Sequence, residues 1–143
     1  MVNASANNWY EGLRVFVYGT LKPGGHYWPQ FCEGKVVGWS EARVKGRIYD
    51  LPVGYPAVSF EGEGWVQGVV LSLKDVSGLK GLDRLEGFDP LRPRANRNEY
   101  IRKKVHAWLV EEERIERVWG YEMSLERISR HGGRFLEEGV WPS

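Results

Sequence analysis

The stretch V-F-V-Y-G-T-L, residues 15–21, governs how the rest of the chain is interpreted. Its β-branched and aromatic residues predict a strand over residues 13–18, and Gly19 indicates an abrupt turn. The K-P-G-G that follows, residues 22–25, continues a strand poorly, so the backbone amides near Gly19 lack ladder partners. Two interpretations are open: an ordinary tight turn, or a concavity of N–H groups that holds an anionic oxygen of a ligand.

The composition is that of a globular chain of 143 residues, with 42% hydrophobic and 27% charged residues. The 20 basic and 19 acidic residues are dispersed and leave a formal net charge of +1, so nucleic acid is not an expected partner. No apolar run reaches the roughly 20 residues of a membrane helix, and the N-terminus lacks a secretory pattern. We therefore expect a cytoplasmic protein without membrane association. The single cysteine, Cys32, excludes an internal disulfide.

Short β segments separated by glycine dominate the chain, and 18 glycines with 7 tryptophans favour a compact β-rich protein. Residues 1–12 are polar and aperiodic, which predicts a mobile lead-in. Further predicted strands span residues 36–44, 47–51, 57–60, 65–73, 100–110 and 115–123, and predicted helices span residues 26–33, 78–86 and 124–130.

The helix predicted over residues 78–86 has Asp75 or Ser77 as its N-cap and Gly87 at its end. It places Glu86 at the helix C-terminus. An ionised carboxylate there faces the negative end of the helix dipole, at a cost of about 0.3–1 kcal/mol. The same effect favours a carboxyl that keeps its proton, as acid–base chemistry at neutral pH requires. The alternative is a solvated helix-end carboxylate.

Two other features each have two interpretations. The polar loop at residues 88–98 is longer than usual connections, and it is either a lid over a pocket or a surface excursion. Arg102 lies in the strand predicted after it. Its guanidinium either counters a substrate carboxylate or pairs with a neighbouring glutamate.

Other chemistries lack their residue patterns. His26, His106 and His131 have no ligand spacing with Cys32, so no metal site is expected. The chain has no G-x-S-x-G elbow, and Cys32 has no local histidine and acid signature, so covalent nucleophilic catalysis is not favoured. The G-T-L-K-P-G-G of residues 19–25 lacks the glycine order of a nucleotide-binding loop.

Four motifs occur in order: Y-G-T-L at residues 18–21, Y-P-A at 55–57, L-D-R-L-E-G-F at 82–88 and Y-I-R-K-K-V at 100–105. Together they resemble the γ-glutamylcyclotransferase-like family, which includes the γ-glutamylamine cyclotransferases and AIG2-like proteins. The resemblance covers residues 13–123.

The resemblance implies an α+β fold over a single domain, residues 13–143: a small mixed β-barrel with a few flanking short helices and a pocket at one barrel mouth. It also implies that Glu86 is the catalytic general acid/base. The substrate-binding residues that it implies are Tyr18, Gly19, Thr20, Leu21, Tyr100 and Tyr121. From the residues alone, a core or barrel-lining side chain is the favoured interpretation of Tyr18, whereas Tyr100 and Tyr121 are equally wall packing.

The implied reaction is that of a cofactor-independent acyltransferase. In a γ-glutamyl amide the free α-amino group attacks its own γ-carbonyl, closing the ring of 5-oxoproline and releasing an amine. Glu86 serves as base and then acid, and amides at residues 19–21 are the available oxyanion donors. No metal or cofactor is required. Free γ-glutamyl amino acids, γ-glutamyl-ε-lysine, glutathione and a γ-glutamyl protecting group all remain open as substrates. The alternative is a non-catalytic binding module that holds a small acidic metabolite or a peptide end on the same barrel.

Overall fold

The structure is a computed structural model that describes residues 13–19, 21–25, 28–89, 91 and 98–142. The expectations for residues 1–12 and Thr20, and for most of the 88–98 loop, fall outside the described residues. In chain order the elements are β1 Arg14–Val17, α2 Trp28–Phe31, β2 Val36–Lys45, β3 Arg47–Asp50, β4 Pro56–Ser59, β5 Trp65–Leu73, α3 Val76–Leu85, β6 Ile101–Leu109, β7 Arg114–Glu122, α4 Leu125–Arg130 and β8 Arg134–Phe135.

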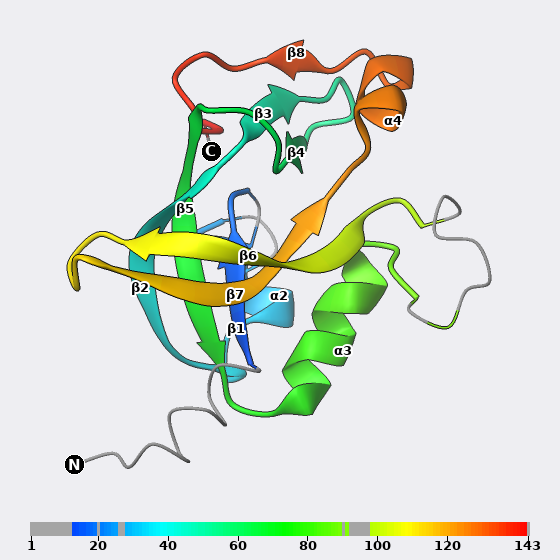
Figure 1. Cartoon of the computed structure of the whole chain (residues 1–143). Coiled ribbons are helices and arrows are strands. Elements are labelled where there is room, and N and C mark those ends of the chain that lie inside the picture. Colours follow the sequence, from blue (N-terminus) through cyan, green and yellow to red (C-terminus); the bar gives the residue numbers. More distant parts are fainter. Residues whose placement is uncertain (1–12, 20, 26–27, 90, 92–97, 143) are drawn as a thin grey trace.

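Five strands close into a barrel in the order β1-β5-β2-β6-β7 (Figure 1). Neighbouring strands are antiparallel except for β1 and β7, which run parallel with Val15 opposite Trp119 and Phe16 opposite Gly120. This parallel pair closes the barrel and makes it mixed. The predicted α+β fold with a small mixed barrel and short helices is therefore confirmed. Each predicted strand agrees with the observed one to within one residue at either end.

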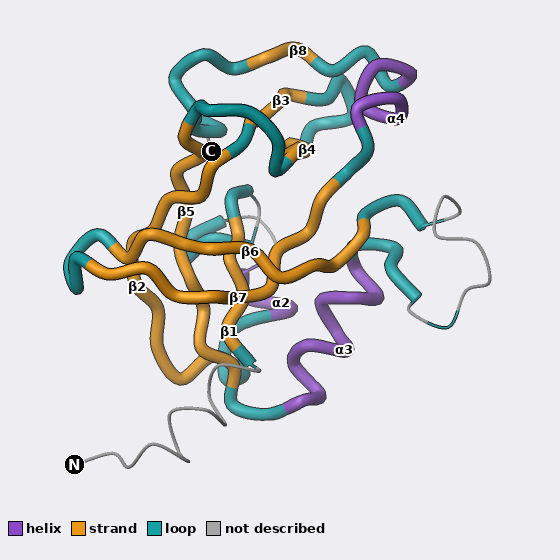
Figure 2. The backbone as a smooth tube through the Cα atoms, in the orientation of Figure 1, coloured by secondary structure: helices purple, strands orange, loops and turns teal. Residues whose placement is uncertain are grey.

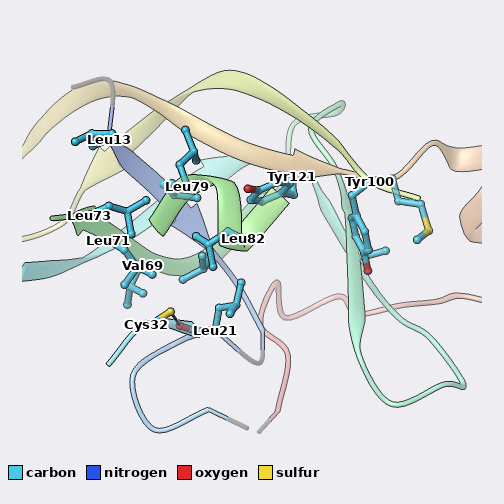
Figure 3. Packing of buried hydrophobic residues seen from close by; sticks show 14 of the residues in the cluster. Leu13, Leu21, Cys32, Val69, Leu71, Leu73, Leu79, Leu82, Tyr100 and Tyr121 are labelled. Carbon is cyan, nitrogen blue, oxygen red and sulfur yellow. Dashed lines mark hydrogen bonds between the residues drawn. The ribbon is translucent and has the colours of Figure 1, made fainter. Parts of the chain in front are cut away.

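Strand β1 is buried on both faces from Val15 to Val17, which explains why every residue after Arg14 in this strand is apolar. Phe16 belongs to a buried cluster that draws on all five barrel strands. Val15 and Val17 belong to a second cluster, in which the outward faces of β1 and β5 meet helix α3. Figure 3 shows Leu79 and Leu82 of α3 directed into this second cluster. Strand β1 therefore contributes side chains to two hydrophobic clusters, one on each of its faces.

Helix α3 starts earlier than predicted, at Val76, because Asp75 takes the N-cap position. The Asp75 side chain accepts a hydrogen bond from Ser77 N at 3.0 Å. At the other end Glu86 is the C-cap, and its N–H donates to Leu82 O at 2.9 Å. Gly87 follows with φ of 67°, a left-handed conformation that favours glycine and stops the helix. The helix therefore ends where the sequence predicts, with Glu86 at its terminus.

A second sheet, in the order β4-β3-β8, lies with α4 above the barrel in Figures 1 and 2. Strand β8 was not predicted, since two residues carry no readable alternation. The C-terminal segment beyond it contacts both sheets: Gln67 N of barrel strand β5 donates to Gly139 O at 2.8 Å, and Trp141 Nε1 donates to Asp50 Oδ1 of β3 at 3.1 Å. Among the described residues, no helix has the length and apolar character needed to cross a membrane.

Candidate active site

Three strand ends meet at one end of the barrel. Since β1 and β7 are parallel and β6 is antiparallel to β7, the ends of β1 and β7 lie beside the start of β6. This arrangement brings Tyr18, Tyr121 and Tyr100 together from positions far apart in the sequence. Helix α3 also ends here and adds Glu86.

A cavity of about 170 Å³ lies between these strand ends, the α3 terminus and the turn that precedes β4. Every predicted site residue that the structure describes lies on its wall, and Thr20 lies outside the described residues. The wall also contains residues to which the sequence assigned no role. The polar side chains on the wall are those of Tyr18, Tyr55, Glu86, Glu99, Tyr100 and Tyr121. Gly19, Leu21 and Pro56 also line it, at the turn after β1 and the start of β4.

The turn after β1 packs tightly against the Y-P-A segment. A Cβ atom at Gly19 would lie 2.7 Å from Pro56 Cγ, so only glycine allows this close approach. The Gly19 carbonyl accepts from Lys22 N at 3.1 Å, which closes the turn. In the described part of the chain, no residue accepts from the backbone N–H of Gly19 or of Leu21. These two donors are available to a bound ligand.

Four tyrosines on the wall donate their hydroxyl protons to acceptors within the protein. Burial raises the pKa of Tyr18, Tyr100 and Tyr121 above the ordinary value for tyrosine, so these rings stay neutral. With the proton engaged, each hydroxyl oxygen offers the cavity only its lone pairs. The hydrogen bonds run from Tyr18 to Tyr121 O at 2.8 Å, from Tyr55 to Glu99 Oε1 at 2.7 Å, from Tyr100 to Pro56 O at 2.7 Å and from Tyr121 to Asp83 Oδ1 at 2.7 Å.

Glu86 lies in this wall with no cationic side chain beside it among the described lining residues. Burial raises the pKa of its carboxyl to about 8, and the negative charge of Glu99 adds to the increase. The sequence argument attributed a retained proton to the helix terminus, whereas burial is the larger cause here. At neutral pH most copies of this carboxyl are neutral, yet it ionises within the working range of an acid–base group.

The predicted pairing of Arg102 with a glutamate is wrong. Its Nε lies 3.0 Å from Asp83 Oδ1, so its partner is an aspartate of α3 and not a glutamate. Its guanidinium also stacks over the rings of Trp119 and Phe88, at 4.3 and 5.5 Å from the ring centroids. Arg102 is absent from the cavity wall among the described residues, so it does not face a substrate carboxylate in that cavity.

Sequence reasoning missed Tyr55 and Glu99 as site residues. Tyr55 carried a signal, because it opens the Y-P-A motif, but no role was assigned to it. Glu99 directly precedes Tyr100, and no role was assigned to it from the sequence. Its place in the wall depends on how the chain returns from α3 to β6, which the sequence pattern does not show.

Cys32 does not face the cavity. Its side chain is fully buried beside Leu21, whose carbonyl lies 3.8 Å from Sγ (Figure 3). Burial raises the pKa of the thiol to about 11, so little thiolate forms at neutral pH. Within the described ranges, no group of three or more histidine, cysteine, aspartate or glutamate side chains is arranged to hold a metal ion.

Residues 15–143 match the sequence profile of a family described as gamma-glutamyl cyclotransferase, AIG2-like. No curated protein matches the chain significantly.

Solved structures from bacteria, plants and animals share the fold at low identity. YkqA from Bacillus subtilis is 22% identical with a TM-score of 0.62; the match covers 90% of this chain and 39% of YkqA. A protein from Arabidopsis thaliana is 23% identical with a TM-score of 0.63, covering 87% of this chain and 70% of that one. An AIG2-like protein from Mus musculus is 17% identical with a TM-score of 0.57, covering 91% and 88%. The chain therefore spans well under half the length of YkqA.

Proposed function

The chain belongs to the AIG2-like gamma-glutamyl cyclotransferase family, and from this premise we propose that it cyclises a γ-glutamyl amide. The α-amino nitrogen forms a bond to the γ-carbonyl carbon of the same molecule. The bond from that carbon to the leaving nitrogen then breaks, giving 5-oxoproline and a free amine. Because nucleophile and electrophile are already joined, the protein needs only to fold the substrate and move protons, without a cofactor.

The observation that carries this proposal is the isolated carboxyl of Glu86 in the cavity wall. Its pKa of about 8 lets it exist in both protonation states near neutral pH. In the ionised state it takes a proton from the α-ammonium group, which frees the nitrogen lone pair for attack. In the protonated state it gives that proton to the leaving nitrogen. The attacking nitrogen still carries a second surplus proton in the tetrahedral intermediate and loses it as the lactam forms. That proton leaves on the product amine, which departs as an ammonium ion, so the proton count balances and Glu86 is ionised again for the next cycle.

The oxyanion of the tetrahedral intermediate requires hydrogen-bond donors fixed in advance. The backbone N–H groups of Gly19 and Leu21 have no acceptor among the described residues and line the same cavity as Glu86. We assign these two donors to the developing oxyanion. The close contact of Gly19 with Pro56 holds the turn in place for this role.

The experiment that tests the proposal incubates the purified protein with γ-glutamyl amides and follows 5-oxoproline release by mass spectrometry. The panel contains γ-glutamyl amino acids, γ-glutamyl-ε-lysine, glutathione and a simple γ-glutamyl alkylamide. We expect release from at least one amide by the wild type and its loss in Glu86→Gln. Binding of an amide with unchanged mass would instead identify a non-catalytic binding module.

A further inference from the structure

A second acidic side chain, Glu99, faces the same cavity as Glu86. Its Oε1 accepts the hydroxyl proton of Tyr55 at 2.7 Å, which orients the carboxylate. Its backbone N–H donates to Gly87 O at 3.3 Å, and a Cβ atom on Gly87 would lie only 3.2 Å from Glu99 Cβ. The chain therefore holds Glu99 against the residue that follows Glu86.

The polar wall around these two carboxyls offers almost only acceptors to a ligand. Each wall tyrosine has its proton engaged with an acceptor inside the protein. No lysine, arginine or histidine lines the cavity among the described residues. The charged and titratable groups that face Glu99 are Glu86, Tyr55, Tyr100 and, beyond them, Tyr18. A ligand group that complements this wall carries positive charge and several hydrogen-bond donors, which describes a primary ammonium.

We propose that Glu99 binds the α-ammonium group of the substrate and thereby restricts the site to γ-glutamyl compounds whose α-amino group is free. This inference rests on the proposed function for the identity of the ligand. Glu99 anchors the ammonium with its charge and Tyr55 orients the anchor, while Glu86 exchanges the proton.

The test compares two ligands that differ only in the amino group: γ-glutamyl methylamide, and the monomethylamide of glutaric acid, which lacks it. Binding is measured by calorimetry in Glu86→Gln, so that turnover does not interfere. We expect the amino ligand to bind at least about tenfold more tightly. In Glu86→Gln/Glu99→Gln the ratio of the two affinities should fall to within about threefold, because the carboxylate that attracts the ammonium group has been removed. The amide oxygen introduced by Glu99→Gln can still accept the Tyr55 proton, so the orientation of the side chain is retained.

The matched control is Glu61→Gln, which removes the same charge from an exposed residue outside the cavity wall. In Glu86→Gln/Glu61→Gln the tenfold ratio should persist. If the Glu99 variant does not fold, Tyr55→Phe provides a second measure, since it frees the carboxylate to turn and should lower the ratio by a smaller factor. An unchanged ratio in either variant overturns the inference, as does failure of the amino ligand to bind Glu86→Gln.

The outcome is separable from that of the proposed function. A protein that releases no 5-oxoproline yet shows the ligand ratio retains Glu99 as an ammonium anchor and loses only the reaction. If the protein releases 5-oxoproline but binds the two ligands equally tightly, the proposed reaction stands and the ammonium-binding role of Glu99 is refuted.

Discussion

Asp83 and Glu86 lie three residues apart at the end of helix α3, and they have opposite surroundings. Asp83 accepts the hydroxyl proton of Tyr121 at 2.7 Å and lies 3.0 Å from Arg102 Nε. Glu86 has no cation beside it among the described cavity residues, and the nearest charge that affects it, Glu99, is negative. The end of α3 therefore carries two kinds of carboxyl. Asp83 is compensated, because the positive charge of Arg102 lies beside it. Glu86 is uncompensated, because no cation lies beside it among the described cavity residues.

This difference indicates that Asp83 stabilises the fold and that Glu86 is the carboxyl suited to proton transfer. Burial raises the pKa of Asp83, but Tyr121 and Arg102 oppose that increase and stabilise its charge. Asp83 therefore connects α3 to strands β6 and β7 through Arg102 and Tyr121. No comparable partner among the described cavity residues stabilises the charge of Glu86, so its proton is exchangeable near neutral pH. The predictions that follow would break this contrast or sharpen it.

The largest expected effect contrasts Glu86→Gln with Asp83→Asn, the same chemical change at both carboxyls. Glu86→Gln should lower kcat/KM for 5-oxoproline release about 10²–10⁴-fold without loss of thermal stability at pH 7, because Glu86 is mostly neutral there. Asp83→Asn should lower Tm and retain more activity than Glu86→Gln. Turnover is measured by mass spectrometry and Tm by calorimetry. Equal activity losses with equal Tm values would remove the distinction.

Next in size is the loss of the cation beside Asp83. Arg102→Met leaves the largely buried carboxylate of Asp83 with Tyr121 as its one side-chain partner among the described residues, and it removes the stacking on Trp119. It should therefore cost about 2–4 kcal/mol of unfolding free energy. Urea denaturation measures the change. Arg117→Met, an exposed arginine on the neighbouring strand, is the matched control and should cost less than about 0.5 kcal/mol. Equal stability of the two variants would contradict the supporting role of Arg102.

A third prediction concerns stability as a function of pH. Folding raises the pKa of Glu86 from its ordinary 4.5 to about 8, so between these values the folded protein binds more protons than the unfolded chain. Its stability therefore falls as pH rises through this window. The glutamine side chain of Glu86→Gln does not titrate, so the variant should gain on the order of 4 kcal/mol of unfolding free energy over wild type between pH 4 and pH 9. Urea unfolding at several pH values tests this; a difference that is independent of pH would refute it.

The smallest effect is a shift of the pH–rate profile. Ionised Glu86 is required for the first proton transfer, so kcat/KM should rise with pH to a midpoint near 8. Glu99 contributes to that pKa through its negative charge, and Glu99→Gln should move the rising limb to lower pH. Steady-state kinetics across pH 5–10 measure the profile, with Glu61→Gln as control. An unmoved limb in Glu99→Gln would mean that the two carboxyls are uncoupled.

Much of the fold was readable from local patterns. Strand alternation, the Asp75 cap and Gly87 located the elements, because these signals depend only on near neighbours in the chain. Strand β8 was missed, since Arg134–Phe135 pairs with β3 through a short contact that has no pattern of its own. The partner of Arg102 was also missed. Arg102 and Tyr121 lie opposite each other in the β6–β7 register, and both reach Asp83 from outside its helix.

The amino-acid sequence by itself determined that a buried strand ends at Gly19 and that α3 ends at Glu86. It also determined that the end of α3 carries two carboxyls three residues apart, Asp83 and Glu86. Such properties follow from backbone propensity and side-chain period, which act over a few residues. Only the tertiary structure decided which carboxyl is compensated. Charge compensation depends on groups brought in by β6 and β7 and on the burial around each side chain, and both arise when the barrel closes.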